Sequence, residues 1–344
     1  VFQVPSCFAL DRFSPRNVMV VSFSVVALGT CLFALAGDLF GMTAARILIG
    51  VGTAAFGASI YVIVAQNFER RNFGFLNGMI GTLGGFGGVL AAYPLAVALQ
   101  RTSWETVFLS MAAVAMVLVV SIWIGIDRGS PPKDQSGKGP TDLWTLLRSS
   151  EYVKICVMGF VSYAPIVTIT GLWGGPYLQT GLGLSAEGAG GILSTCFVAA
   201  IFGGFAFGVM DRSFAKRHRL VLLAAVASVL TFGGLALLPN VSPMVGAALL
   251  VGMVFFQQFH IMLGAHLRKI VPDHLIGRAA AIQNVVAVAA IPILQTGFGA
   301  AMDYSIAKGA SGTAQFTISF LGMAVLIGIC AAIYATARNA NEDA

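Results

Sequence analysis

Charged side chains are scarce in this sequence. Lysine, arginine, aspartate and glutamate make up 10% of its 344 residues, hydrophobic residues make up 57%, and the mean hydropathy is +0.86. A water-soluble domain carries about 25% charged residues, so that class of protein is excluded. The five cysteines lie in apolar segments and lack the paired or clustered spacing of disulfide frameworks and metal sites. We therefore expect small core thiols.

Long apolar runs dominate the chain instead. Each is about the ~20 residues that cross ~30 Å of hydrocarbon as a helix. Their continuity excludes the alternating pattern of barrel strands, and backbone groups in lipid need internal partners. We predict an all-α polytopic membrane protein. The segments cover residues 18–36, 42–65, 75–98, 107–126, 154–178, 188–210, 220–238, 242–265, 279–301 and 315–336.

The positive charges predict an orientation, because short cytoplasmic loops retain lysine and arginine. Seventeen of the twenty cationic residues fall in or beside alternate loops, whereas Arg101 and Lys308 fall in the opposite loops and Arg46 lies inside a segment. We place the basic loops, the central linker and the C-terminus in the cytoplasm, and the protein in the cytoplasmic (inner) membrane. The net charge of +6 is then a topology signal, so no nucleic-acid partner is expected.

An internal repeat divides the segments into two halves of parallel topology. Asp11-Arg12 and Asp211-Arg212 open equivalent basic loops 200 residues apart. Fifty-eight residues separate Val153 from Asp211, whereas ten precede Asp11, so we expect about 48 residues to be missing from the front. The intact protein should have twelve spans as six plus six, of which about ten complete spans and a stub are present here.

Three regions follow from this division. We predict an incomplete N-terminal transmembrane bundle at residues 1–126, a cytoplasmic linker at residues 127–152 and a C-terminal six-helix bundle at residues 153–344. The linker holds the only long polar stretch and is rich in glycine, proline and charge, which is typical of a flexible tether.

This architecture resembles the major facilitator superfamily of secondary transporters, and the resemblance covers essentially the whole chain. Its most specific element is the loop after the second span, where the family pattern is Gly-x-x-x-Asp-Arg-x-Gly-Arg-Arg or close to it. Asp11, Arg12 and Arg16 match, while Cys7, Ser14 and Pro15 stand at positions where other residues are usual. The resemblance implies two six-helix lobes that alternate access to a shared site.

The Asp-Arg signature has two interpretations. The resemblance implies a gate, in which Asp11, with Arg12 and Arg16, pairs across the interface between the halves and releases as they rotate. Asp211 and Arg212 keep the charge pattern in the second copy. The alternative is a topology anchor that serves only the positive-inside bias.

Arg46 opens a second element, because Arg46-x-x-x-Gly50-x-Gly52 resembles the motif of the family's fourth helix. An intramembrane cation is costly and normally faces a cavity or a partner. Arg46 is expected to bind an anionic substrate group or to modulate a carboxyl, and the alternative is an interfacial arginine that reaches the outer surface. Helical spacing puts on one face Arg46, Gly50, Thr53, Gly57 and Tyr61.

The second half carries two further polar faces. Tyr163, Thr170 and Trp173 suit a binding wall, although Trp173 and the neighbouring Tyr177 also fit an interfacial aromatic belt, the better interpretation for Tyr177. His260 is a candidate proton carrier or a neutral core residue, on a stripe of Met253, Gln257, His260 and Gly264. We predict these substrate-binding residues: Arg46, Thr53, Tyr163, Thr170, Trp173, Gln257, His260 and Asn284.

Glycines cluster at Gly81, Gly84, Gly85, Gly87 and Gly88. A phosphate-binding loop is excluded because no strand precedes them and they lie inside a lipid-length segment. We expect a seam that lets helices approach closely, echoed in the second half by Gly204 and Gly208. The glycine–proline pair usual in drug and proton antiporters of the resembled family is missing, which weakens an efflux assignment.

Acidic residues are absent from the middle of every apolar segment, whereas proton-driven transporters commonly need a buried carboxyl. Either that acid lies in the missing spans, or His260 substitutes for it, or transport is not proton-coupled. The leading hypothesis is secondary active uptake of a small polar or anionic organic solute by a monomer in the lipid bilayer, with H+ as a candidate coupling ion.

Two alternatives stay open: a drug or metabolite efflux antiporter, and a non-transporting sensor of similar fold. An enzyme is not expected, because no nucleophile–base pair, metal cluster or cofactor loop is visible, and no cofactor or metal is expected either.

Overall fold

The computed structural model describes residues 13–54, 56, 59–60, 63–64, 73–126, 146–213, 217–238, 242–271 and 275–337. Within these residues every regular element is helical, which confirms the all-α prediction. Nine described stretches are long and apolar enough to cross a membrane, and Leu39–Ala54 is a shorter apolar helix. Each of these ten stretches overlaps one of the ten predicted segments, and the chain is a multi-pass membrane protein.

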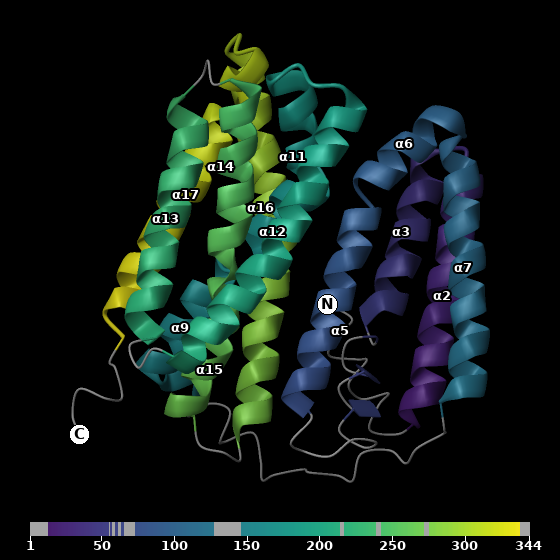
Figure 1. Ribbon diagram of the computed structural model, residues 1–344, viewed down its shortest axis with the longest axis horizontal. Helices are drawn as coiled ribbons and strands as arrows, with labels where there is room; N and C mark the ends of the chain where they lie inside the picture. Colours follow the sequence, from purple (N-terminus) through teal and green to yellow (C-terminus); the bar gives the residue numbers. More distant parts are fainter. Residues whose placement is uncertain are drawn as a thin grey trace. The chain divides into compact units, whose positions relative to one another are not determined.

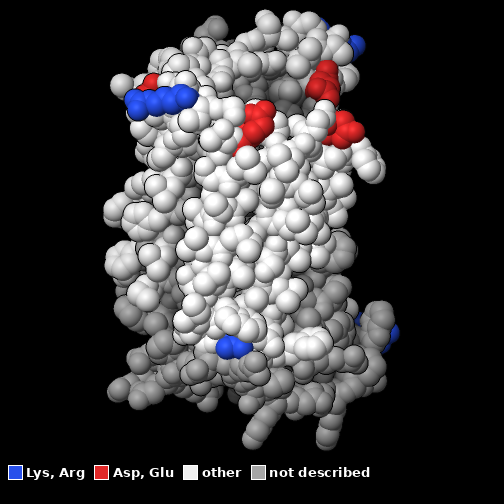
Figure 2. All heavy atoms as spheres, turned by 90° about the vertical axis from the view of Figure 1, so that its right-hand side faces the viewer, with Lys and Arg blue, Asp and Glu red and all other residues white. Residues whose placement is uncertain are grey.

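Charge is distributed as a membrane requires on the face drawn in Figure 2. Its acidic side chains gather near one end, where basic side chains also lie, and the described atoms of the broad band beneath them belong to uncharged residues. A basic side chain lies toward the other end of that face. A wide uncharged band suits contact with hydrocarbon, where an unpaired charge is expensive.

The internal contacts divide the chain into two compact units. Unit 1 comprises Val1–Gly84 and Val97–Ser136, and unit 2 comprises Gly85–Ala96 and Gly137–Ala344. By its contacts the segment Gly85–Ala96 therefore belongs to unit 2, although it precedes the linker in sequence. The predicted boundaries at residues 126 and 152 stay a prediction.

Unit 1 is organised around α2 (Pro15–Leu35), which packs against α3 (Leu39–Ala54) and α7 (Trp104–Gly125) (Figure 1). Helix α2 begins with a cap, because the Oγ of Ser14 accepts a hydrogen bond from the Asn17 N–H at 3.4 Å and proline occupies its first position. The departure from the family pattern at Ser14 and Pro15 thus has a local cause.

Glycines set the distance between α2 and α3. A Cβ on Gly52 would lie 2.7 Å from the carbonyl oxygen of Ser22 and 2.7 Å from Val26, whereas Gly50 has open space around it. A Cβ on Gly29 would lie 2.8 Å from the side chain of Ile49. The two glycines of the Arg46 motif therefore differ: Gly52 serves helix packing and Gly50 does not.

The helices of unit 2 enclose one apolar core. Helices α5 (Phe73–Leu90) and α6 (Tyr93–Arg101) follow each other along one span. The middle of this span, Gly85–Ala96, belongs to unit 2, and its two ends belong to unit 1. The remaining elements are α9 (Ser150–Phe160), α10 (Ala164–Thr168), η2 (Ile169–Trp173), α11 (Gly174–Pro176), η3 (Tyr177–Gly181), α12 (Ala186–Ser213), α13 (Arg217–Leu237), α14 (Pro243–Phe256), η4 (Gln257–Phe259), α15 (His260–Ile270), α16 (Ile276–Ala307), η6 (Gly312–Phe316) and α17 (Thr317–Ala335).

Aromatic contacts fill this core. Tyr177 is fully buried and meets Phe316 and Phe320 edge to face, with ring centroids 5.4 and 5.0 Å apart. The interfacial-belt prediction for Tyr177 is therefore wrong, because the π-helical turn η3 directs the ring inward against η6 and α17. The hydroxyl of Tyr152 donates to the Ala279 carbonyl at 2.9 Å and ties α9 to α16.

Candidate functional site

Two spans of unit 2 are interrupted near their middles. In Ser150–Gly181, α9 ends at Phe160 and α10 begins at Ala164 after a turn; in Pro243–Gly264, η4 separates α14 from α15. Proline explains the first interruption, because Pro165 has no N–H and its ring clashes with the carbonyl of residue i−4, which is Val161. The Val161 carbonyl is left without its usual helical partner.

Gln257 supplies the missing donor. Its Nε2 donates to the Val161 carbonyl at 3.3 Å, and its side chain is completely buried. A residue at the interruption of the second span thus pairs with the carbonyl that the first interruption leaves free, and a backbone carbonyl in the membrane needs such an internal partner. The Oε1 of Gln257 has no hydrogen-bond partner, nor does the buried hydroxyl of Thr168.

Tyr163 and His260 lie together at the same level. Their ring centroids are 5.6 Å apart, and the Nδ1 of His260 lies 3.4 Å from the Gln257 carbonyl. Tyr163 exposes 41% of its surface. Three predicted binding residues therefore meet here, and we call Val161, Tyr163, Gln257 and His260 the break site.

The predicted stripe of the second span is split by η4. Met253 and Gln257 are buried in the core, His260 is half-buried and Gly264 is exposed. A 3₁₀ turn advances about 120° per residue instead of about 100°, so three residues rotate the following face by about 60°. Gln257 consequently belongs to the framework of the break site and His260 to its surface.

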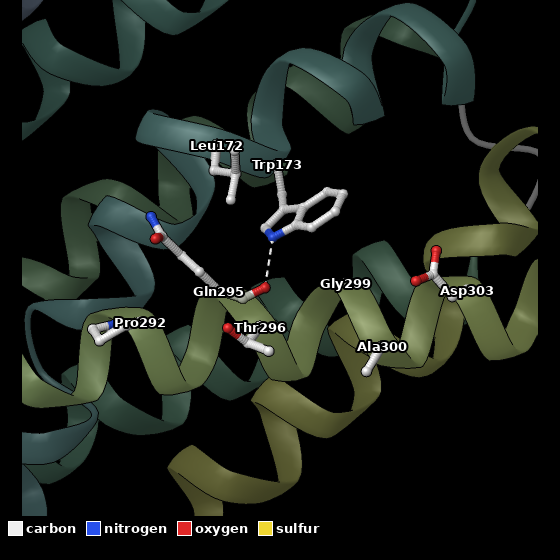
Figure 3. A pocket seen from close by; sticks show the side chains of 8 residues that line it. All are labelled: Leu172, Trp173, Pro292, Gln295, Thr296, Gly299, Ala300 and Asp303. Carbon is white, nitrogen blue, oxygen red and sulfur yellow. Dashed lines mark hydrogen bonds between the residues drawn. The ribbon is translucent and has the colours of Figure 1, made fainter. Parts of the chain in front are cut away.

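A hollow of about 450 Å³ opens beside Trp173 (Figure 3). The Nε1 of Trp173 donates to the Gln295 carbonyl at 2.9 Å, and its ring stacks on Phe298 with centroids 5.5 Å apart. A Cβ on Gly299 would lie 2.7 Å from the indole, so glycine is needed beneath the ring. The hollow is lined by Leu172, Trp173, Pro292, Gln295, Thr296, Gly299, Ala300 and Asp303.

The lining residues of α16 were missed by the sequence analysis. Pro292, Gln295, Gly299 and Asp303 recur at spacings of three and four and so share one helical face. The available signal was a Gln295-Thr296 pair inside an apolar segment one turn after a proline. Trp173, predicted from the facing span, completes this hollow, which we call the Trp173 pocket.

The remaining predicted binding residues either hydrogen-bond to carbonyls of their own helices or lie outside the break site and the Trp173 pocket. Thr170 donates to the Ile166 carbonyl at 2.8 Å, and Thr53 bonds to the carbonyls of Ile49 and Gly50 at 3.1 Å each. Asn284 is exposed on α16. Thr53 lies in unit 1, and Gly57 and Tyr61 of the same predicted face lie outside the described residues.

Arg46 is exposed on α3 and has an aromatic partner in unit 1. Its guanidinium lies over the Phe33 ring, 4.6 Å from the centroid, and Phe33 in turn contacts Trp104 and Phe108. A cation–π contact offsets part of the cost of a charge within a span. Both interpretations of Arg46 stay predictions.

The predicted gate is described only in part. Asp11 and Arg12 lie outside the described residues, as does the side chain of Arg212, and Asp211 is half-buried on α12. Within unit 1, Arg16 donates to the Ile126 carbonyl at 3.3 Å and lies over the Trp123 ring. This cation at the C-terminal end of α7 complements the helix dipole. These contacts stabilise the packing of α2 against α7 within unit 1.

The described part of the chain contains no group of three or more His, Cys, Asp or Glu side chains that could hold a metal ion. The polar groups of the break site and the Trp173 pocket are instead uncharged donors and acceptors beside aromatic rings and one carboxylate.

Known proteins resemble this chain in sequence and in fold. A nitrite extrusion protein of Bacillus subtilis (strain 168) is 23% identical over 251 residues, which are 72% of this chain and 60% of that protein. The structure of the nucleoside transporter NupG matches with a TM-score of 0.76 at 12% identity, over 98% of this chain and 87% of that one.

A bacterial homologue of the human lysosomal transporter Spinster, in an inward-facing and unoccupied conformation, matches with a TM-score of 0.74 at 14% identity, over 98% of this chain and 85% of that one. Likenesses at such low identity show a common fold. The family model of the Major Facilitator Superfamily matches residues 1–295. This chain therefore belongs to the Major Facilitator Superfamily.

Proposed function

We propose that this protein is a secondary active transporter that takes up a small polar organic solute across the cytoplasmic membrane by alternating access. The break site carries the proposal. Solute sites of secondary transporters lie near the bilayer midplane at discontinuous helices, whose freed backbone groups and adjacent side chains contact the solute. Tyr163 and His260 stand at such a discontinuity in two spans at once.

The side chains available to a solute favour hydrogen bonding over charge pairing. The Tyr163 hydroxyl, the His260 imidazole and, in the Trp173 pocket, Gln295 and Thr296 are hydrogen-bonding groups, and Asp303 is the one carboxylate that lines that pocket. His260 is also our candidate proton carrier, because its imidazole contacts the exposed Tyr163 ring and stands at the break.

Counterflow in proteoliposomes tests this proposal. Proteoliposomes that contain the full-length protein would be loaded in turn with nitrite, D-xylose, L-fucose and uridine. Exchange of the labelled solute would be measured with and without a pH gradient. We expect exchange of a neutral polar probe, weakened severalfold by Tyr163→Phe and unchanged by Tyr304→Phe, a control at an exposed tyrosine outside the site. No exchange of any probe, or equal effects of both variants, would contradict it.

The proton role of His260 has its own readout. If His260 carries the coupling proton, His260→Gln should abolish the stimulation by a pH gradient while counterflow exchange persists, because exchange needs no net proton movement. Stimulation that survives in the glutamine variant would rule out His260 as the carrier.

Export of a small anion is the second candidate, favoured by the likeness to a nitrite extrusion protein. Arg46 is then the binding cation. Arg46→Ala should abolish nitrite exchange, whereas Phe33→Leu, which removes the ring beneath the guanidinium but keeps the charge, should retain most of it. Nitrite exchange that is unchanged in Arg46→Ala would refute the assigned role.

A further inference from the structure

The span formed by α5 and α6 is broken between Leu90 and Tyr93. Pro94 explains why a break occurs here, since it has no N–H for the Leu90 carbonyl four residues earlier. The chain tightens into a 3₁₀-type turn, in which the Ala92 N–H donates to the Val89 carbonyl at 3.3 Å. The Tyr93 N–H would donate to that same carbonyl in a regular α-helix.

Ser194 of α12 stands between these two backbone groups. Its Oγ accepts the Tyr93 N–H at 2.9 Å and donates to the Val89 carbonyl at 3.1 Å. One hydroxyl thus bridges the donor and the acceptor of a missing helical bond. A side chain inserted into the hydrogen-bond ladder in this way is a recognised cause of helix kinks.

Small residues allow the approach that the insertion needs. A Cβ on Gly88 would lie 2.4 Å from the Phe197 ring, and one on Gly85 would lie 2.7 Å from Ile201. On α12, a Cβ on Gly190 would lie 3.2 Å from the Cα of Tyr93. The predicted glycine seam is therefore real at Gly85 and Gly88, and the contacts run in opposite order along the two segments.

A second contact holds α12 in the same register. The Tyr93 hydroxyl donates to the Oε1 of Glu187 at 3.0 Å. Glu187 precedes Ser194 by seven residues, two helical turns, and so shares its face of α12. Tyr93 is consequently held through both its backbone N–H and its side chain.

We propose that Ser194 is the wedge of a two-state kink in the α5–α6 span. With α12 docked, Ser194 holds the Tyr93 N–H and the span is kinked. When α12 withdraws, the Tyr93 N–H returns to the Val89 carbonyl, and the Ser194 hydroxyl donates to the Gly190 carbonyl of its own helix. Every one of these groups is hydrogen-bonded in both states, which makes the exchange feasible in lipid.

The use of this switch rests on the proposed function, because alternating access requires helices such as α12 to move between two arrangements. The switch itself needs no solute. It assigns Ser194 as a positioning residue, acting through the backbone of α5 and α6 and touching no solute.

Paired spin labels at positions 83 and 99 test the switch. Both side chains are exposed and flank the break, and sixteen residues of straight helix span about 24 Å. The labels would be placed in full-length protein in lipid nanodiscs, with the native cysteines replaced, and their distance distribution would be measured by pulsed electron–electron double resonance. We expect a shorter and a longer population, corresponding to the kinked and the straighter span.

Ser194→Ala should shift this equilibrium toward the longer distance by about fivefold, as expected for one lost net hydrogen bond. Ser194→Thr keeps the hydroxyl and should restore the parental distribution. Thr195→Ala is the matched control, because the hydroxyl of Thr195 bonds only to the Gly191 carbonyl of its own helix at 3.0 Å. A distribution unchanged by Ser194→Ala, or shifted equally by Thr195→Ala, would overturn the proposal.

Transport separates this inference from the proposed function. If the distance distribution shifts as expected, the switch stands even if none of the four probes is exchanged. If a probe is exchanged, Ser194→Ala should change its exchange rate severalfold and leave its binding affinity unchanged, and an effect on affinity alone would count against a positioning role.

Discussion

The two units hold their helices together in different ways. In unit 1, α2 meets its neighbours mainly through glycines such as Gly29 and Gly52 and through the aromatic contacts of Phe33, and one long-range bond joins Arg16 to the Ile126 carbonyl. In unit 2, side chains donate to backbone carbonyls far away in sequence, as Tyr152 does to Ala279 and Trp173 does to Gln295.

The reason for the difference is helix continuity. An unbroken helix satisfies its own backbone in lipid and needs only shape to pack, so small residues suffice. An interrupted helix leaves carbonyls unpaired, and Gln257 at Val161 shows that a neighbouring span must then supply a donor. At Val161, therefore, a helix interruption and a long-range hydrogen bond occur together.

The largest expected effect of a single methyl group is in unit 1. Gly52→Ala should lower the free energy of unfolding by about 2–3 kcal/mol, because the new Cβ meets the Ser22 backbone and cannot be relieved by a side-chain movement. Thermal unfolding in detergent measures this, and hydrogen exchange should report it in α2 and α3 only. Gly50→Ala, in open space, is the control. Faster exchange throughout unit 2 would show that the units do not unfold independently.

In unit 2, Gly299→Ala should cost less, about 1–2 kcal/mol, because the Cβ meets the edge of the Trp173 ring, which can tilt away. The tilt should weaken the bond to the Gln295 carbonyl and change the tryptophan fluorescence. Gly297→Ala has no neighbour within reach and should do neither. A loss of stability as large as that of Gly52→Ala would contradict the contrast between the units.

Tyr152→Phe tests a long-range hydrogen bond without changing the packing volume. It removes the bond to the Ala279 carbonyl and should cost about 1 kcal/mol. Chemical unfolding in mixed micelles would measure the difference from the parent protein. The control is Tyr304→Phe, because Tyr304 is exposed. Equal stabilities for the two variants would mean that such bonds do not hold unit 2 together.

The smallest expected effect is at the end of α7. Arg16→Gln removes a cation from the helix C-terminus and from the Trp123 ring, at a cost of about 0.5–1 kcal/mol. Exchange of the last amides of α7 should quicken while unit 2 is unaffected. Arg101→Gln, at the exposed end of α6, serves as the control. Unaltered exchange in α7 would show that the Arg16 contacts contribute nothing.

Sequence reasoning succeeded where one residue type decides the outcome. The ten apolar segments were predicted because lipid selects long apolar helices, and Gly85 and Gly88 were identified because only small residues allow close contact. It could not foresee a change of local helix geometry. Met253, Gln257, His260 and Gly264 were expected on one face, but the three-residue 3₁₀ turn η4 separates the two buried residues, Met253 and Gln257, from the other two. The substrate-binding role of Gln257 stays a prediction.

The candidate site was predictable in composition but only partly in arrangement. Tyr163 and His260 were chosen separately, one from each span, and the fold brought their rings together. Gln295 and Thr296 were passed over because nothing in their own segment indicated that Trp173 would lie against them.

By itself the sequence determined the helical class, the number of described spans and the chain's place in a membrane, because hydrophobicity is a property of each residue and adds along a segment. The tertiary structure decided which polar groups meet, as with Ser194 at Tyr93 and Gln257 at Val161. Such pairings depend on the rotation and register of helices distant in sequence, and those are set by packing between surfaces that no single segment contains.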